Sequence, residues 1–478
     1  MRWRDLLSLQ TEHPLPEDVF ETPRRVHFLG IGGIGMSALA LLLKARGHSV
    51  SGSDERDGAM PNKLREAGIE VFIGHDAKNV AGAQAIFYSS AIPPANPEWR
   101  AGHDAGIPFY HRAQLLAHVS NRAKISIAVS GTHGKSTTSA MIAHILTETG
   151  HNPTAILGAV YPPFGSNLRI GDPDLVVVEA DESDGSFTLL EPTVAVVLNV
   201  EPEHLENYDE SEEELWRAFK MFADTNAEQC LWNANQKDLP YKMLDPFMPG
   251  LGFDFGIEAG VMQARDLEFS QGQVHFKIES PSNTAATFLQ VPGKHNVSNA
   301  TAAILSCDFV VEEPFQNLVN ALPTFAGTLR RFERKGEASG VVVYDDYGHH
   351  PTEVRATLGA AHEFLGRPIA VIFQPHRYSR TQALWRDFGT AFESADTVII
   401  TQLYSAHEAP IAGVSGRLVY DAVRESNPGK PVFYAADLDA ALKLALENVK
   451  PGDALLTMGA GDVTTLGARV LEALGALD

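Results

Sequence analysis

Runs of apolar, β-branched residues alternate with helical patterns along most of the chain. This alternation is typical of α/β proteins whose strands form parallel sheets. In the first block a helix is predicted from residue 36 to residue 47, and prolines mark a loop at residues 92–98. The strands predicted for this block are residues 26–30, 48–54, 69–74 and 85–92.

A second block begins near residue 120 and continues the alternation. A helix after its first strand is expected to end near Gly150. Strands are predicted at residues 125–131, 174–181 and 194–200, and their nearly continuous apolar runs suit strands buried on both faces. Residues 262–290 instead alternate polar and apolar positions around a glycine-containing turn, which predicts an antiparallel excursion.

A third block begins near residue 326 and predicts a smaller nucleotide-binding fold, with helical stretches such as residues 438–449 between its strands. These strands are predicted at residues 341–348, 369–375, 396–404, 432–437 and 453–461. The whole pattern predicts an α/β protein of three domains, at residues 1–119, 120–325 and 326–478, of which the first and third are Rossmann-like.

Composition narrows the classes of function. The 478 residues carry 38 Lys and Arg against 60 Asp and Glu, and this net charge of −22 argues against a protein that coats nucleic acid or an anionic membrane. The cysteines, Cys230 and Cys307, are expected to be free thiols in a reducing cytoplasm. The N-terminus shows no signal-peptide pattern, and no apolar run reaches the roughly 18 residues of a spanning helix. A soluble, cytoplasmic protein is therefore expected.

A glycine-rich turn follows the first predicted strand. Gly30 to Gly35 fit the pattern G-x-G-x-x-G, and Asp54 ends the next strand nineteen residues after Gly35. Such a turn lets backbone N–H groups approach a pyrophosphate at the N-terminus of a helix. The motif favours an anionic nucleotide, but it does not distinguish a dinucleotide from a UDP-sugar.

A sharper motif, GTHGKST, lies at residues 131–137 between a strand and a helix. It is a shortened phosphate loop, because the strict pattern requires glycine where this chain has Val129. Its amides would cradle phosphates, Lys135 would neutralise them, and the Ser136 hydroxyl is suited to Mg²⁺. A lysine in the first turn of a helix is unfavourable without an anion. The motif predicts ATP and a central domain of the P-loop ATPase type, with a mostly parallel sheet.

Polar residues also stand at the ends of other predicted strands, where open α/β sheets place their ligands. The segment EADESD at residues 179–184 offers carboxylates for Mg²⁺, although four acids in six residues cannot all be ligands. His204 is either structural or a ligand, and the chemistry of the residues from His295 to Asn299 favours capping of a helix over contact with a nucleotide. In the third block the polar positions are Arg330, Arg331, Asp345, Asp346, Tyr347, His349, His350, Arg377 and Arg380.

Together these residues resemble the Mur ligase family, the ATP-dependent enzymes that build the peptide of peptidoglycan. The likeness extends from residue 28 to beyond residue 460. The chain departs from the family at Ser136, where threonine is usual, and at Glu203, where aspartate is usual; both keep the chemical group. The segments that carry the resemblance are FLGIGGIGMSALA, YSSAIPPANPE, VSGTHGKSTTSAMI, EADESDGSF, NVEPEHLENY, PGKHNVSNA, YDDYGHHPTEV, FQPHRYSRT and YSAHEAPIAG.

The resemblance implies a ligase of cell-wall biogenesis, and hence of cell shape and division. YDDYGHHPTEV and FQPHRYSRT resemble the subgroup that joins L-alanine to the carboxylate of UDP-N-acetylmuramate and releases ADP and phosphate. The domains would in turn bind the UDP-sugar, bind ATP, and bind the amino acid while closing over both. The expected partners are these two substrates, with no nucleic acid and no membrane.

The resemblance also assigns roles to individual positions. The sugar nucleotide would contact Gly32, Gly33, Ile34, Gly35, Met36, Asp54, Ser89, Ser90 and Arg112. ATP would contact Gly131, Thr132, His133, Gly134, Lys135, Ser136, Thr137, His295, Asn296, Asn299, Arg330 and Asp345, which overturns the capping preference. One Mg²⁺ would be held by Ser136 and Glu179, and a second would be held by His204. The alanine and the reacting carboxyl would be surrounded by Tyr347, His349, Arg377 and Arg380, and the catalytic residues would be Lys135, His204, His349, Arg377 and Arg380.

The chemistry agrees with this assignment. Oxide is a very poor leaving group, so a carboxylate does not acylate an amine unaided. Transfer of the γ-phosphoryl group of ATP makes an acyl phosphate, whose leaving group is phosphate, and bringing the two anions together demands cations. His349 or His350 is suited to take a proton from the alanine ammonium. Three alternatives remain: a recycling ligase that adds a preformed tripeptide to the same sugar, a nicotinamide dehydrogenase, and a non-catalytic nucleotide-binding regulator.

Overall fold

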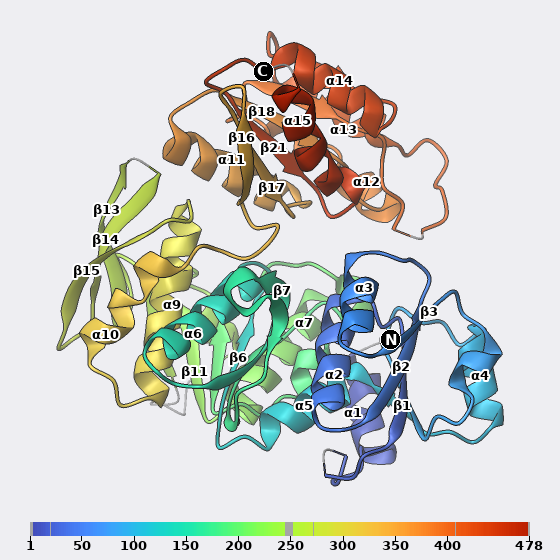
Figure 1. Cartoon of the computed structure of the whole chain (residues 1–478). Coiled ribbons are helices and arrows are strands. Elements are labelled where there is room, and N and C mark those ends of the chain that lie inside the picture. Colours follow the sequence, from blue (N-terminus) through green and yellow to red (C-terminus); the bar gives the residue numbers. More distant parts are fainter. Residues whose placement is uncertain (1–2, 20, 244–251, 271, 407, 477–478) are drawn as a thin grey trace. The chain divides into compact units, whose positions relative to one another are not determined.

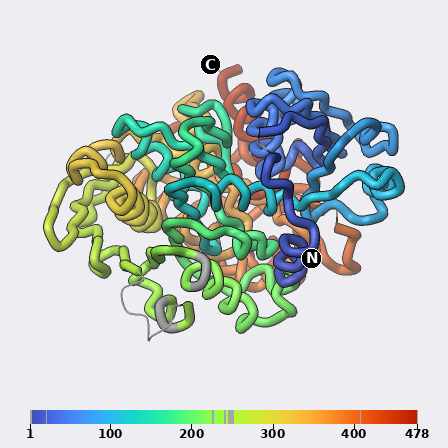
Figure 2. Tube along the Cα trace, turned by 90° about the horizontal axis from the view of Figure 1, so that it is seen from below, coloured from blue at the N-terminus to red at the C-terminus, as the bar shows by residue number. Residues whose placement is uncertain are grey.

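The structure, a computed structural model, describes residues 3–19, 21–243, 252–270, 272–406 and 408–476. Figure 1 shows its helices and strands, and Figure 2 follows the same chain as a Cα trace. The chain forms two compact units that are described separately below. The first unit comprises Met1–Arg265, Ile278–Ala285 and Ser298–Leu322, and the second comprises Asp266–Lys277, Ala286–Val297 and Pro323–Asp478.

The N-terminal sheet of the first unit is parallel and has the order β3-β2-β1-β4-β5. The order reverses beside β1, so the turn after β1 lies at the switch point where open α/β sheets bind ligands. Its strands are β1 (Arg25–Leu29), β2 (Ser49–Asp54), β3 (Glu70–Ile73), β4 (Ala85–Tyr88) and β5 (Phe109–His111). The helices are α1 (Trp3–Glu12), α2 (Ile34–Ala45), α3 (Ala59–Glu66), α4 (Pro97–Asp104) and α5 (Arg112–Asn121). Of the five strands β1–β5, the first four were predicted and the three-residue β5 was not.

The central sheet has ten strands in the order β15-β14-β13-β12-β11-β10-β6-β9-β7-β8. Its strands are β6 (Ile125–Ser130), β7 (Pro153–Tyr161), β8 (Ser166–Arg169), β9 (Asp172–Glu179), β10 (Val194–Val197), β11 (Gln229–Asn233), β12 (Gly252–Ile257), β13 (Met262–Ser270), β14 (Gln273–Glu279) and β15 (Thr284–Leu289). The helices are α6 (Lys135–Glu148), α7 (Glu212–Lys220), α8 (Leu239–Met243), α9 (Lys294–Val310) and α10 (Phe315–Asn320). The strand character predicted for residues 262–290 is confirmed.

Strand β6 is parallel to both of its neighbours, β9 and β10. Val129 pairs with Glu179 of β9, and Ser130 pairs with Val197 of β10. The carboxyl ends of these three strands therefore lie side by side. They bring together the loop that begins at Gly131, the acidic segment 179–184 and the chain that leads to His204.

The sheet of the second unit has the order β16-β17-β21-β18-β19-β20, and all neighbours are parallel except β16 and β17. Its strands are β16 (Glu333–Ala338), β17 (Val341–Asp346), β18 (Ile369–Phe373), β19 (Thr397–Ile400), β20 (Val432–Tyr434) and β21 (Ala454–Met458). The helices are α11 (Pro351–Leu365), α12 (Tyr378–Leu384), α13 (Gly416–Ser426), α14 (Leu438–Asn448) and α15 (Thr465–Gly475). All five strands predicted for this block are present, and β16 was missed.

Helices cover both faces of this sheet, so alternate residues of one strand enter different cores. Val371 and Phe373 of β18 belong to one apolar cluster, whereas Ala370 and Ile372 belong to the other. A strand buried on both faces reads as a continuous apolar run, and this explains why the pattern was visible in the sequence. The three sheets lie within the three predicted blocks, while the boundaries near residues 120 and 326 stay predictions.

Other expectations concern the whole chain. Cys230 and Cys307 are buried free thiols, and burial raises the pKa of Cys230 to about 12. In the part of the chain that the structure describes, no helix is both long and apolar enough to span a membrane.

Candidate active site

The glycine turn after β1 is closed by its own hydrogen bonds. The amides of Gly30 and Ile31 both donate to the Ser53 carbonyl at 2.9 Å, and the Gly32 amide donates to Asp54 Oδ2 at 2.9 Å. A Cβ on Gly32 would lie 2.8 Å from the same Asp54 oxygen, so any larger residue there would have to displace this carboxylate. One oxygen of Asp54, predicted to bind substrate, thus fixes the turn itself.

A cavity of about 240 Å³ lies beside this turn, within the first unit. Among the residues predicted to bind the sugar nucleotide, Gly33, Ile34, Gly35, Met36, Ser89 and Arg112 line it. Glu179 and Asp181 of the central domain line it as well, together with Gly158. The structure therefore brings the glycine turn and the acidic segment to one cavity, while Gly32, Asp54 and Ser90 are not part of its lining.

The phosphate loop joins β6 to α6. Gly131 and Gly134 have φ angles of 133° and 89°, in the region that favours glycine. Asn199, just after β10, holds the loop: its backbone carbonyl accepts from the Thr132 amide at 3.0 Å, and its Oδ1 accepts from the His133 amide at 2.8 Å. Sequence reasoning missed Asn199, although a polar residue that ends a buried apolar strand beside a phosphate loop was a usable signal.

Lys135 is largely buried, and its ammonium already has partners. Nζ lies 2.6 Å from Glu182 Oε2, and it donates to the carbonyls of Gly131 and Thr132 at 2.8 and 3.2 Å. Burial alone lowers the pKa of Lys135, but the charges of Glu182 and its acidic neighbours more than offset this and raise it above the usual value. The lysine is therefore a permanent cation above the loop.

The acidic segment 179–184 distributes its carboxylates among different partners. Glu179 Oε2 accepts from the Gly158 amide at 3.1 Å, Glu182 pairs with Lys135, and Asp184 Oδ2 lies 2.8 Å from Arg112 Nη2. Burial raises the pKa of Glu182. Glu182 and Asp184 thus hold cations, and Glu179 and Asp181 are left facing the cavity.

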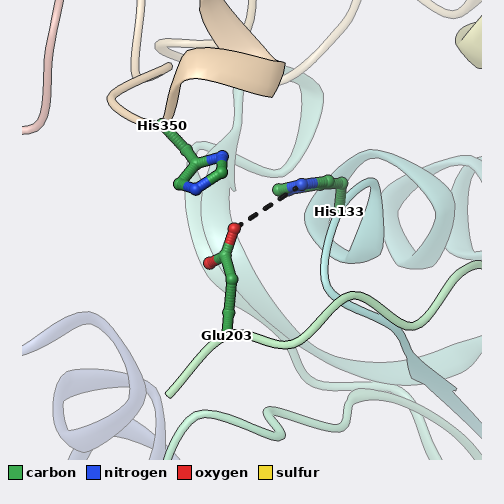
Figure 3. Close-up of side chains that lie close together, drawn as sticks. All are labelled: His133, Glu203 and His350. Atoms are coloured by element: carbon green, nitrogen blue, oxygen red, sulfur yellow. Dashed lines mark ion pairs between the residues drawn. The ribbon is translucent and has the colours of Figure 1, made fainter. Parts of the chain in front are cut away.

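His204 adopts a left-handed backbone conformation with a φ of 57°. Its ring nitrogens lie 3.8 Å from Glu203 and 3.7 Å from Glu206. Burial lowers the pKa of His204, but the nearby carboxylates of Glu206, Glu182 and Glu203 outweigh it and raise the pKa. His133 of the phosphate loop and Glu203 point toward one another, with 3.8 Å between Nε2 and Oε1 (Figure 3). His133 and His204 therefore both lie beside Glu203.

His295, Asn296 and Asn299, the polar residues at the start of α9, are divided between the two units: the first two belong to the second unit and Asn299 belongs to the first. Asn299 lies against the phosphate loop, because a Cβ on Gly134 would be 2.9 Å from its Oδ1. Asn296 Nδ2 donates to the Pro292 carbonyl at 2.7 Å, a contact local to the helix start, and the His295 ring packs on Gly293. Of these three residues, Asn299 is the one that shares a unit with the phosphate loop and lies against it.

In the second unit, Arg330 and Asp345 lie together at the ends of β17 and β21. Arg330 Nη2 donates to the Gly459 carbonyl at 2.6 Å, and Nε lies 3.4 Å from Asp345 Oδ2. The fully buried Asp345 also accepts from the hydroxyls of Thr457 and Thr464 at 2.6 and 2.7 Å. Arg330 has a φ of 59°, so this cation is held in a strained backbone position.

A cluster of aromatic rings and cations follows β17 and β18. The His349 ring lies 5.2 Å from Tyr347 and 5.6 Å from His376, and His376 stacks on Tyr404. Arg380 Nη1 lies 3.3 Å from His376 Nδ1. Burial lowers the pKa of His349 to about 4 and that of His376 to about 3, so both rings are neutral at pH 7. His376 was missed as a site residue, although it lies inside a quoted segment.

The adjacent His350 has a structural task. It is the N-cap of α11, its Nδ1 accepts from the Thr352 amide at 3.4 Å, and Glu353 completes the capping box. Arg377, exposed and with a φ of 68°, precedes α12 and lies one residue from His376. The structure thus places His349 between Tyr347 and His376, with Arg380 against His376.

The fold and these strand-end groups define a nucleotide-binding α/β enzyme with a phosphate loop. Residues 25–124, 129–307 and 330–461 match the catalytic, middle and glutamate ligase domains of the Mur ligases. The chain belongs to the Mur ligase family.

Individual relatives agree along nearly the whole length. The UDP-N-acetylmuramate–L-alanine ligase of Geobacter sp. strain M21 is 42% identical over 95% of this chain and 98% of its own. The protein of the same name from Desulfosudis oleivorans is 41% identical over 94% and 98%. The crystal structure of UDP-N-acetylmuramate-alanine ligase from Thermotoga maritima has a TM-score of 0.84 at 30% identity, covering 95% of this chain and 100% of that one. A murein peptide ligase from Psychrobacter arcticus shares the fold, with a TM-score of 0.69 at 24% identity over 95% and 99%.

Proposed function

We propose that this chain is an ATP-dependent ligase that joins L-alanine to the carboxylate of UDP-N-acetylmuramate and releases ADP and phosphate. The observation that carries the proposal is the shared site of the first unit. Glu179 lines the cavity beside the glycine turn. It ends β9, and β9 pairs with β6, the strand that leads into the phosphate loop. A sugar nucleotide and ATP can meet at such a site. The relatives that bear the alanine ligase name support the choice of amine.

The reaction has two chemical steps. A carboxylate oxygen of the sugar nucleotide attacks the γ-phosphorus of ATP, ADP leaves, and an acyl phosphate forms. The alanine amine then attacks the carbonyl carbon, and phosphate leaves with the electron pair of the C–O bond. In the first step two anions approach each other, so fixed positive charge lowers the barrier. Lys135 supplies it, since nearby carboxylates keep its ammonium protonated.

Residues of the first unit fit a magnesium ion by their chemistry. The hydroxyl of Ser136 and the carboxylate of Glu179 are oxygen donors of the kind Mg²⁺ prefers. Glu179 ends β9, and Ser136 lies in the first turn of α6, the helix that follows the neighbouring strand β6. When bound, Mg²⁺ would screen phosphate charge and polarise the phosphoryl group. A role for His204 in holding a second ion is a further prediction.

In the second unit we assign the amino acid to the ring and cation cluster. Arg377 and Arg380 would bind the alanine carboxylate, since guanidinium groups match carboxylates in geometry and charge. His349 is better suited than His350 to accept a proton from the alanine ammonium. His349 Nδ1 donates to the Tyr347 carbonyl at 3.0 Å, which leaves Nε2 as an acceptor, whereas Nδ1 of His350 is used as a helix cap. Arg330 and Asp345 are assigned to the phosphate and ribose of ATP. Catalysis in a cytoplasmic setting stays a prediction.

An ADP-release assay with UDP-N-acetylmuramate and a panel of amines tests the proposal. ADP is expected with L-alanine and not with the preformed tripeptide, whereas release that depends on the tripeptide would establish the recycling alternative. Lys135→Ala should lower turnover by at least about 10²–10³-fold, because a preorganised charge at the phosphoryl group is lost. Lys124→Ala is the matched control, since Lys124 is an exposed lysine paired with Asp174. Turnover of Lys135→Ala at the control rate would refute the assigned phosphate loop.

A further inference from the structure

Arg112 stands at the first position of α5 and forms part of the cavity wall beside the glycine turn. Its side chain is 15% exposed, and Nη2 lies 2.8 Å from Asp184 Oδ2 and 3.5 Å from Ser186 Oγ. Asp181 Oδ2 is more distant, at 3.8 Å. A cation of the N-terminal domain is therefore held mainly by one carboxylate of the central domain.

Asp184 is in turn fixed by a chain of hydrogen bonds. His111 Nδ1 accepts from the Ala113 amide, so its neutral ring carries the proton on Nε2 and donates to Ser90 Oγ at 2.9 Å. The Ser90 hydroxyl then donates to Asp184 Oδ2 at 3.1 Å, and the Ser186 amide donates to Oδ1 at 3.0 Å. Each hydrogen bond from His111 through Ser90 to Asp184 has a fixed donor and a fixed acceptor. The Asp184 carboxylate therefore has one favoured position.

The charges of this network fit the same arrangement. Burial lowers the pKa of His111 to about 4, so the ring is neutral at pH 7 and donates as described. Burial raises the pKa of Asp184, but the charge of Arg112 and the hydrogen bonds from Ser186 outweigh it and hold that pKa far below its usual range. Asp184 thus stays ionised although it is buried.

The other end of the guanidinium faces the glycine turn. Nη1 of Arg112 would lie 3.7 Å from a Cβ on Gly35, in the first turn of α2. Among the described residues the structure gives Nη1 no hydrogen-bond partner. A cation at a helix N-terminus is unfavourable without an anion between them, because the helix end carries positive partial charge. The fixed orientation of Arg112 therefore prepares the cavity for an anionic group.

We propose that Asp184 is a positioning residue for the sugar nucleotide: it holds Arg112 so that the guanidinium and the start of α2 receive the same anionic group. The inference rests on the proposed function, since it takes a UDP-sugar as the occupant of the cavity. A carboxylate that merely neutralised Arg112 would compete with the ligand anion. Its removal would then tighten binding, so the two roles predict opposite signs.

Calorimetric titration of the full-length protein with UDP-N-acetylmuramate, UDP and ADP separates these roles. Asp184→Asn is expected to weaken both uridine ligands by about tenfold or more and to change ADP affinity less than twofold. In the Arg112→Gln background, Asp184→Asn should add no further loss, because Asp184 acts through Arg112. Unchanged or tighter uridine binding, or additive losses in the double variant, would overturn the proposal.

Controls keep the result interpretable. Asp174→Asn breaks an exposed pair with Lys124 near the start of β9, the strand that leads into the acidic segment 179–184, and it should leave all three affinities unchanged. If Asp184→Asn does not fold, Ser90→Ala removes one donor and keeps the charge; we expect uridine affinity to fall by a few-fold, and no fall would count against the proposal. Absence of uridine binding by the unaltered protein would refute the proposed function instead.

Discussion

The cations of the first unit and the histidines of the second are both buried near strand ends, yet their surroundings do opposite things to their charge. Lys135 and Arg112 each lie within 3 Å of a carboxylate from one acidic segment, and their pKa values are raised despite burial. His349 and His376 face arginines as well as each other, and burial dominates, so their pKa values fall to about 4 and about 3.

This difference matches the two tasks that the ligase must perform. Phosphate and pyrophosphate are permanent anions, so the groups that meet them must stay charged at every working pH. An amine nucleophile must lose a proton, so the groups around it must include neutral acceptors. The two regions therefore differ in which effect dominates: carboxylates outweigh burial at Lys135, whereas burial outweighs the nearby Glu353 carboxylate at His349.

The largest effect is expected at the Glu182–Lys135 pair. Glu182→Gln leaves the Lys135 ammonium buried without its close carboxylate and should reduce the free energy of unfolding by about 3 kcal/mol, since breaking a buried pair costs much of the desolvation of the remaining charge. Urea unfolding measures this. Asp174→Asn removes the carboxylate of an exposed pair and should change little. Equal effects of the two variants would show that burial does not distinguish the pairs.

An intermediate effect is expected when Glu179 is displaced without changing its chemistry. A Cβ on Gly158 would lie 2.0 Å from Glu179 Oε1, so Gly158→Ala must push the carboxylate away. We expect the rate of ADP release to fall by about 10–100-fold, as when partners of a metal ligand are altered. Gly359→Ala is the control, because nothing lies within 4 Å of a Cβ there. Full activity of Gly158→Ala would show that Glu179 is not part of the active site.

The smallest effect concerns pH. NMR titration of ¹³C-labelled histidine rings should show His349 neutral down to about pH 5, whereas His204 should titrate above the usual value of about 6.5. Folded His349 binds fewer protons than the unfolded chain between pH 4 and about 6.5, so its contribution to stability is lost as the pH falls through that range. Titration of His349 near 6.5 would erase the contrast between the two regions.

Much of this architecture was legible in the sequence, for physical reasons. Buried parallel strands leave long apolar runs, and Gly131 and Gly134 mark a loop whose backbone only glycine adopts easily. Strand β16 was missed because its sequence, ERKGEA, is charged, as an edge strand exposed to solvent often is. The three-residue β5 is too short to show a period.

The partners of individual side chains were beyond the sequence. Nothing in EADESD indicates that Glu182 meets Lys135 while Asp184 meets Arg112, because that choice depends on distances across two sheets. Asp54 was predicted to contact the sugar nucleotide, yet one of its oxygens fixes the glycine turn. Of the adjacent histidines, only the structure shows that His350 caps a helix.

The central claim is that ATP activates the carboxylate of the sugar nucleotide by phosphoryl transfer. Its most direct test uses UDP-N-acetylmuramate with ¹⁸O in that carboxylate, together with ATP and L-alanine, and mass analysis of the released phosphate. The account predicts one ¹⁸O atom in each phosphate, since the carboxylate oxygen that attacks phosphorus departs with it. Unlabelled phosphate, or label that appears in AMP, would contradict it.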